Sequence, residues 1–276
     1  MIDFFNSVLG RFFDAVFYPF RDLNSWIAMI TISLLTALLM LFVYRLTSDQ
    51  IGIRSVKDKI VAHLLEIRLY KNSMPVTFGA QGKILWYNLK YLGHSLRPML
   101  VMIVPIVLML LQLDLWFGYA SLQPGDSAIV KVLLKEGYRP SAERVGIKSS
   151  TGLVVETPPL RIDSDGEVDW RVRATEPGAR DLAVTVNDQT VTKQIMVGGE
   201  PFAKISPARV APNWFDQLAN PGESVLSDSS AVKRIEVGYR GLRMNLFGWR
   251  LHWLIVYFAF SIIIGLALKG LFKVEV

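Results

Sequence analysis

The hydrophobic residues of this chain gather into three long apolar stretches, and shorter periodic patterns fill the segments between them. The stretches are residues 26–44, 98–117 and 251–270. A helix needs about 20 mostly apolar residues to cross the hydrocarbon core of a bilayer. Backbone polar groups in lipid must be hydrogen-bonded within the segment, which a helix achieves. The pattern therefore predicts an α-helical membrane protein with three transmembrane helices.

Two other segments carry a helical period. In residues 1–25, phenylalanine and valine recur every three or four positions, which is typical of an interfacial amphipathic helix that lies in the membrane surface. In residues 45–97, two such patterns flank a break near Pro75, which predicts a helical hairpin that packs like a short coiled coil. This hairpin either serves as a connector or leaves its apolar faces partly open to a hydrophobic polypeptide.

The pattern changes to a period of two after residue 117. Short β-rich runs between Pro-Gly, Asp-Gly and Asn-Asp turns fill residues 118–199, which predicts an all-β sandwich. Residues 170–186 resemble the late strands of bacterial immunoglobulin-like domains, so we expect an immunoglobulin-like sandwich with Trp170 in its core. Residues 200–250 have weak periodicity and are predicted to be a linker with a short helix near Trp214.

Charge sets the expected orientation. The chain has a net charge of +6, and basic residues greatly outnumber acidic ones in residues 45–97. Positive residues in short loops beside spans stay in the cytoplasm. The hairpin and the tail, residues 271–276, are therefore predicted to be cytoplasmic, and the N-terminus and residues 118–250 to lie outside a multi-pass inner (cytoplasmic) membrane protein. Because the basic residues lie beside spans, we expect membrane lipids and no nucleic acid as their partners.

The sequence offers no catalytic constellation. Cysteine is absent, and His63, His94 and His252 lie in separate segments without metal-ligand spacing. We therefore expect no enzyme activity, no metal and no cofactor. A small set of hydroxyl and amide side chains lies within the apolar stretches, namely Thr31, Ser33, Thr36, Gln112 and Ser261.

A family resemblance adds to these patterns. The first stretch ends LFVYRLT (residues 41–47) and runs into the basic hairpin, the second opens SLRPMLVMIVP (95–105), and the third ends SIIIGLALKGLFKV (261–274). These segments resemble the YidC/Oxa/Alb insertase superfamily, most of all its three-span branch of archaeal YidC-like proteins and the insertase subunit of the ER membrane protein complex. The resemblance implies an outward N-terminus, a cytoplasmic hairpin between the first two spans and a cytoplasmic C-terminus.

Two features depart from that family. Its bacterial members carry an arginine in the part of a span that faces a client-binding groove. In this chain, Arg45 and Arg97 lie instead at the expected cytoplasmic mouth of such a groove. The β-sandwich between the second and third spans is also foreign to the usual family core.

The expected function is that of an insertase or chaperone for client membrane proteins. Thr31, Ser33, Thr36, Gln112 and Ser261 would line a lipid-open groove, with Arg45 and Arg97 at its mouth. Such a groove would lower the cost of bringing a polar client segment into the membrane. The alternative is a non-catalytic envelope-complex subunit, whose spans anchor a sandwich that binds an extracytoplasmic protein partner.

Overall fold

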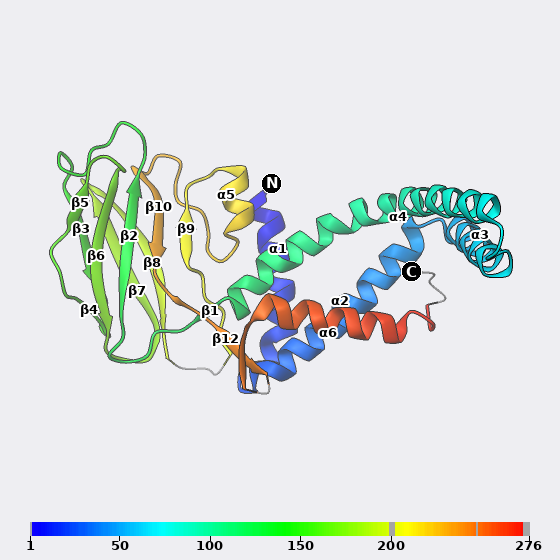
Figure 1. Cartoon of the computed structure of the whole chain (residues 1–276). Coiled ribbons are helices and arrows are strands. Elements are labelled where there is room, and N and C mark those ends of the chain that lie inside the picture. Colours follow the sequence, from blue (N-terminus) through cyan, green and yellow to red (C-terminus); the bar gives the residue numbers. More distant parts are fainter. Residues whose placement is uncertain (1, 199–201, 247, 273–276) are drawn as a thin grey trace. The chain divides into compact units, whose positions relative to one another are not determined.

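The computed structural model describes residues 2–198, 202–246 and 248–272 (Figure 1). The chain forms two compact units. The helical unit comprises residues 29–108 and 254–276, and the β unit comprises residues 1–28 and 109–253. The last predicted segment, the tail of residues 271–276, lies mostly outside the described residues.

Four helices correspond to the apolar stretches and the hairpin. They are α2 (Ser25–Thr47), α3 (Gln50–Leu69), α4 (Met74–Phe117) and α6 (Trp253–Leu268). Helices α2 and α4 are long and apolar enough to cross a membrane. Helix α6 has 16 residues, which at about 1.5 Å per residue is shorter than a hydrocarbon core of about 30 Å.

The third apolar stretch therefore differs from its prediction. Leu251 and His252 belong to strand β13 (Trp249–His252), which pairs with β12 (Arg243–Leu246), and the helix begins only at Trp253. Apolar composition alone does not separate the end of a β-hairpin from the start of a helix. Among the residues that the structure describes, two helices rather than three thus meet the length criterion for a span.

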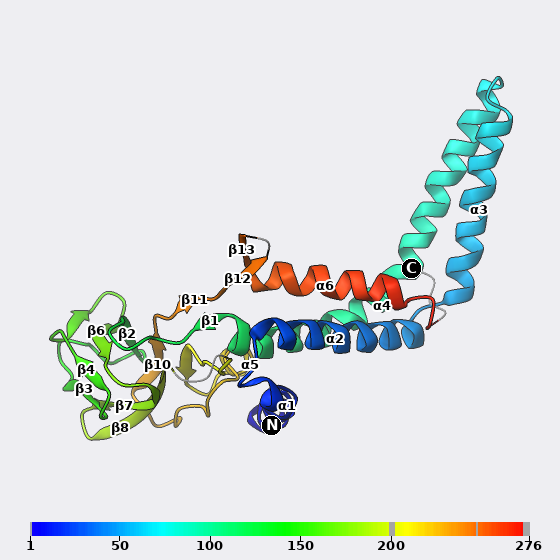
Figure 2. The same ribbon diagram turned by 90° about the horizontal axis from the view of Figure 1, so that it is seen from below.

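The hairpin between the first two stretches is present, and α3 and the first half of α4 lie side by side (Figure 2). The rings of His63 and Tyr87 stack with centroids 5.6 Å apart, and Lys57 lies over the ring of Tyr91. Its second helix does not end before Pro98, because α4 continues without a break to Phe117. Proline is tolerated in membrane helices, where neighbouring groups satisfy the freed carbonyls.

Two sheets face each other in the β unit. The first has the order β4-β6-β2-β10-β9, with β5 also paired to β6, and the second has the order β3-β7-β8. A separate short sheet pairs β1 (Tyr119–Ala120) with β11 (Arg240–Gly241). The strands are β2 (Ser127–Leu134), β3 (Val145–Ser149), β4 (Leu153–Val155), β5 (Leu160–Ile162), β6 (Glu167–Ala174), β7 (Gly178–Val186), β8 (Gln189–Val197), β9 (Ala208–Val210) and β10 (Val232–Val237).

Alternate residues of both sheets form one hydrophobic core. Val130 and Trp170 of the first sheet and Leu182 and Ile195 of the second belong to the same buried cluster. Successive side chains of a strand point to opposite faces, so the period of two in the sequence becomes one buried face per sheet. The predicted sandwich and the core position of Trp170, which is 3% exposed, are confirmed.

The predicted boundary at residue 199 is wrong. Strands β9 and β10 belong to the first sheet, and β10 pairs with the central strand β2. Val232, Ile235 and Val237 are buried in the shared core. A register shift between Val232 and Arg234 spaces these residues irregularly, which hides the period of two. Residues 200–250 are therefore not a linker, although they do contain the short helix α5 (Trp214–Ala219).

The edge of the second sheet is closed by a buried lysine. Lys193 of β8 occupies an inward position that the period assigns to an apolar residue, and it is fully buried. Its Nζ donates to Gln194 O at 3.0 Å and Ser206 O at 2.8 Å, and it pairs with the carboxylate of Glu223. Burial lowers the pKa of Lys193, and Glu223 opposes that shift. The ammonium is thus held by the chain that runs beside β8.

Other side chains cover the same edge. Arg209 Nη1 donates to Thr192 O at 2.6 Å, and the backbone N of Met196 donates to Tyr239 Oη at 3.0 Å. The backbone N of Leu122 donates to Met196 O at 3.2 Å. The backbone groups of Thr192 and Met196 in β8 thus have hydrogen-bond partners on the side away from β7, although no further strand of this sheet lies there among the described residues.

Helix α1 (Ile2–Phe17) forms as predicted, but only part of its apolar stripe is free. Phe17 is buried among Trp116, Phe117 and Phe202, with ring centroids 4.9 to 5.8 Å from its own. Phe12, in contrast, is exposed. Aromatic rings of the protein therefore cover one side of this helix, and Phe12 lies on a side that they leave uncovered.

Candidate functional site

A buried hydroxyl pair joins α2 to α6 in the helical unit. Tyr257 Oη donates to Thr36 Oγ1 at 3.0 Å, and Thr36 Oγ1 donates to Ile32 O, one turn earlier in α2, at 2.8 Å. Both side chains are almost fully buried. Threonine in a membrane helix commonly bonds back to its own helix, whereas the bond from α6 ties two helices together.

Two further hydroxyls flank this pair. Ser33 lies three residues before Thr36, is fully buried, and its Oγ has no hydrogen-bond partner among the described residues. Ser261 is half-buried and lies four residues after Tyr257, a spacing that places two helical residues on one face. Ser33, Thr36, Tyr257 and Ser261 are called the polar layer below.

The structure does not bring all the predicted groove residues together. Thr36 is in the polar layer with Ser33 and Ser261, and Thr31 is half-buried in the same unit. Gln112 lies in the β unit, is 1% exposed, and its Oε1 has no hydrogen-bond partner within the described ranges. The structure therefore brings together only part of the predicted lining.

The two arginines of the predicted mouth are exposed. Arg45 lies in the last turn of α2, and Arg97 precedes Pro98 within α4. Long basic side chains near the ends of apolar segments commonly reach toward the membrane surface. Both positions suit that role.

Sequence reasoning missed Tyr257. We counted it with the apolar residues of the third stretch, although a buried tyrosine hydroxyl usually requires a hydrogen-bond partner. A tyrosine four residues before the only serine of that stretch is the signal that could have identified it.

The hairpin displays apolar side chains on its surface. Residues such as Val61, Leu65 and Leu69 recur every four positions on α3, while Ile53 and Val56 are the buried ones. The more than half-exposed large hydrophobic side chains of the hairpin are Ile51, Val61, Leu64, Leu65, Leu69, Tyr70, Met74, Phe78, Leu85, Trp86, Leu89 and Leu92. Soluble monomers rarely expose so many large apolar groups on one element, so this exposure indicates an interaction surface.

The titratable groups of the sandwich form cross-strand pairs. Lys131 Nζ of β2 lies 2.9 Å from Glu167 Oε1 of β6. Burial raises the pKa of Asp169 to about 6, and the adjacent Glu167 acts in the same direction. No group of His, Asp or Glu in the described part of the chain could hold a metal ion. We assign Glu167 to ion pairing within the sheet, because Lys131 lies on the neighbouring strand.

Comparison with known proteins identifies no family. No protein-family model matches the chain, and no curated protein matches it. Among solved structures, the crystal structure of domains 4 and 5 of the S-layer protein SbsC aligns with 30% of this chain at 19% identity and a TM-score of 0.25. The aligned part spans about half, 48%, of that chain. So limited a likeness carries no argument about function.

Proposed function

We propose that this chain is a membrane protein insertase or membrane-protein chaperone, similar in kind to the YidC/Oxa/Alb superfamily, with nascent membrane proteins as clients. Burial of apolar client residues in lipid supplies the driving force, so the process requires no nucleotide, metal or other cofactor. The chain itself performs no covalent chemistry in this proposal.

The observation that carries the proposal is the exposed apolar surface of the hairpin. The buried residues of α3 are Ile53 and Val56, and Ile53 packs in a cluster with Tyr44 of α2. The stripe of Val61, Leu65 and Leu69 takes no part in this packing and remains exposed. Basic side chains such as Lys59 and Lys90 lie over aromatic rings beside this surface. An apolar surface with a basic surround suits a hydrophobic client segment that carries an acidic flank.

The polar layer supports the same function. Ser33 Oγ is buried and has no partner within the described residues, a state that costs roughly 1 to 3 kcal/mol. We propose that the layer lowers the cost of bringing a hydrophilic client end past the apolar helices.

Topology and location follow from the same proposal. We assign α2, α4 and α6 as three spans of the inner membrane, with the hairpin and C-terminus cytoplasmic and the N-terminus and sandwich outside. The basic excess of residues 45–97 supports this orientation. We also assign the sandwich to the immunoglobulin-like class, on the basis of its two antiparallel sheets and the buried Trp170.

Cysteine labelling tests the topology directly, because the chain has no cysteine of its own. Ser73→Cys lies in the turn between α3 and α4, and Asp188→Cys in the turn between β7 and β8. In intact inverted vesicles, a membrane-impermeant maleimide should label position 73 and not position 188. Solubilised membranes should label both positions. The reverse pattern in intact vesicles would overturn the orientation.

Photo-crosslinking tests the client surface. A photoreactive residue at Leu65, which is exposed on α3, should crosslink to a ribosome-bound nascent chain that bears a hydrophobic segment. The matched control is Val154 on β4, an exposed apolar residue of the sandwich that should give no such product. Equal yields at both positions, or a product only at Val154, would count against the insertase function.

A second candidate function is favoured by one specific observation. The hydrogen bond from Tyr257 to Thr36 pairs two of the span hydroxyls with each other, as in helices that serve only as anchors. The chain would then be a non-catalytic envelope-complex subunit whose sandwich binds a protein partner outside the membrane. A crosslink at Val154 without one at Leu65 is the result that this function predicts.

A further inference from the structure

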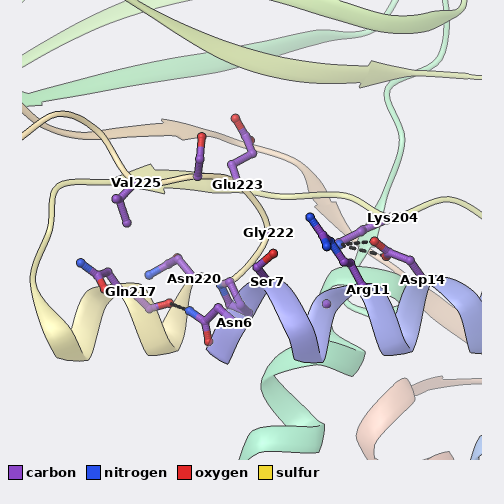
Figure 3. Close-up of a pocket in the computed structure, with 13 residues that line it drawn as sticks. Asn6, Ser7, Arg11, Asp14, Lys204, Gln217, Asn220, Gly222, Glu223 and Val225 are labelled. Carbon is purple, nitrogen blue, oxygen red and sulfur yellow. Dashed lines mark hydrogen bonds and ion pairs between the residues drawn. The ribbon is translucent and has the colours of Figure 1, made fainter. Parts of the chain in front are cut away.

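The β unit contains a polar hollow between α1 and the chain that follows α5 (Figure 3). One face of α1 lines it with Ser7, Gly10, Arg11 and Asp14, and residues 220–225 line the other side. Asn6 Nδ2 donates to the backbone O of Gln217 at 2.8 Å, which holds α1 against α5. The hollow has a volume of about 470 Å³, and sites for small ligands commonly measure about 300–1,000 Å³.

The charges in this hollow do not balance. Lys204 Nζ lies 2.9 Å from Asp14 Oδ1 and 3.3 Å from Oδ2, so these two residues neutralise each other. Glu223 is engaged by the buried Lys193. Arg11 is exposed and forms no ion pair with any residue that the structure describes. The hollow therefore retains the positive charge of one guanidinium.

Arg11 also borders the free apolar face of α1. Residues three or four apart are neighbours on a helix, so Arg11 adjoins Ser7 and Asp14 in the hollow and Val8 on its other side. Val8 and Phe12 are 51% and 60% exposed. A cationic hollow and an exposed apolar face therefore meet at Arg11, which suits a ligand that has an anionic head and an apolar tail.

We propose that the hollow binds the phosphate-bearing headgroup of an anionic phospholipid. Arg11 pairs with the phosphate, whose planar two-point hydrogen bonding a guanidinium matches, and the acyl chains follow Val8 and Phe12. The proposal rests on the topology proposed above, with α1 at the outer membrane surface, and not on the insertase function. The hollow thus fixes one lipid beside the outer ends of the apolar helices.

Lipid titration of the full-length protein in detergent tests this site, with phosphatidylglycerol binding followed by native mass spectrometry. Arg11→Gln should weaken binding about fivefold, as expected for one arginine near a membrane surface, about 1 kcal/mol. Asp14→Asn should strengthen binding, because it frees the charge of Lys204. Arg144→Gln, which removes an exposed arginine at the start of β3, is the matched control and should have no effect. Equal binding by the Arg11 and Arg144 variants would refute the site.

Two further measurements identify the ligand and distinguish the loss of a contact from misfolding of a variant. Arg11→Lys keeps the charge but loses the two-point hydrogen bonding, so its binding should fall between that of the unchanged protein and that of Arg11→Gln. Binding by Arg11→Lys that is weaker than by Arg11→Gln would point to a structural role of Arg11 and overturn the proposal. Glycerol 1-phosphate should not displace phosphatidylglycerol, because it lacks the acyl chains. Displacement at similar concentrations would show a site for free phosphate groups and overturn the lipid assignment.

Discussion

A soluble fragment that ends at residue 198 is expected to show no cooperative melt, whereas a fragment of residues 119–242 melts cooperatively with a β-type circular dichroism spectrum. The shorter fragment lacks β10, which pairs with the central strand β2 and buries Val232, Ile235 and Val237. Each fully buried side chain of this kind contributes about 1.5 to 3 kcal/mol. Their combined loss is comparable to the whole stability of a small domain, about 5 to 15 kcal/mol.

The core tryptophan provides a graded version of this experiment in the longer fragment. Trp170→Ala should lower the free energy of unfolding by about 3 to 5 kcal/mol, because it leaves a cavity between the two sheets. The matched control is Trp214→Ala, which removes an exposed tryptophan of α5 and should change stability little. Chemical denaturation measures both. A cooperative transition from the fragment that ends at 198 would contradict the assignment of β10 to the core.

Removal of three of the four hydroxyls of the polar layer is expected to slow client insertion by on the order of a hundredfold. The variant combines Ser33→Ala, Thr36→Val and Tyr257→Phe, which remove three hydroxyls with little change in shape. Each hydroxyl that would solvate a passing polar group is worth roughly 1 to 3 kcal/mol, and about 1.4 kcal/mol of barrier is tenfold in rate. Insertion of a client with a short hydrophilic outward tail into reconstituted vesicles measures the effect.

The control for this variant removes a hydroxyl outside the layer. Thr47 Oγ1 donates to Val43 O at 2.8 Å within its own helix, so Thr47→Val should leave insertion unchanged. The amount of protein in the membrane should be equal for all variants, which separates insertion from folding. If the triple variant inserts clients at the normal rate, the polar layer has no part in insertion. That result would support the alternative function, a non-catalytic envelope-complex subunit.

The elements that the sequence predicted correctly are those with one strong period. Examples are the apolar stretches of α2 and α4 and the alternating strands around Trp170. In each of them a whole face of the element is apolar, and the regular spacing of apolar residues in the sequence indicates that face. The hairpin was predicted for the same reason. The sequence could not show that Val61, Leu65 and Leu69 remain exposed. Apolar residues occur both on packed faces and on exposed ones, and the sequence alone does not distinguish the two.

The elements that sequence reasoning missed depend on tertiary partners. Strand β10 has an irregular register beside β2, so its buried residues follow no simple period. Lys193 occupies a core position only because Glu223, thirty residues away along the chain, reaches it. The polar layer depends on Tyr257, whose hydroxyl becomes informative only when Thr36 lies opposite. In each case the deciding contact is distant in sequence.

The closed edge of β8 limits how two copies of this protein can join. Proteins confined to a surface meet often and in similar orientations, and an open strand edge there would act as a template for the next copy. Lys193, Arg209 and Tyr239 already occupy the hydrogen-bonding groups that such a copy would need. A strand of a neighbouring copy therefore cannot extend the second sheet beside β8.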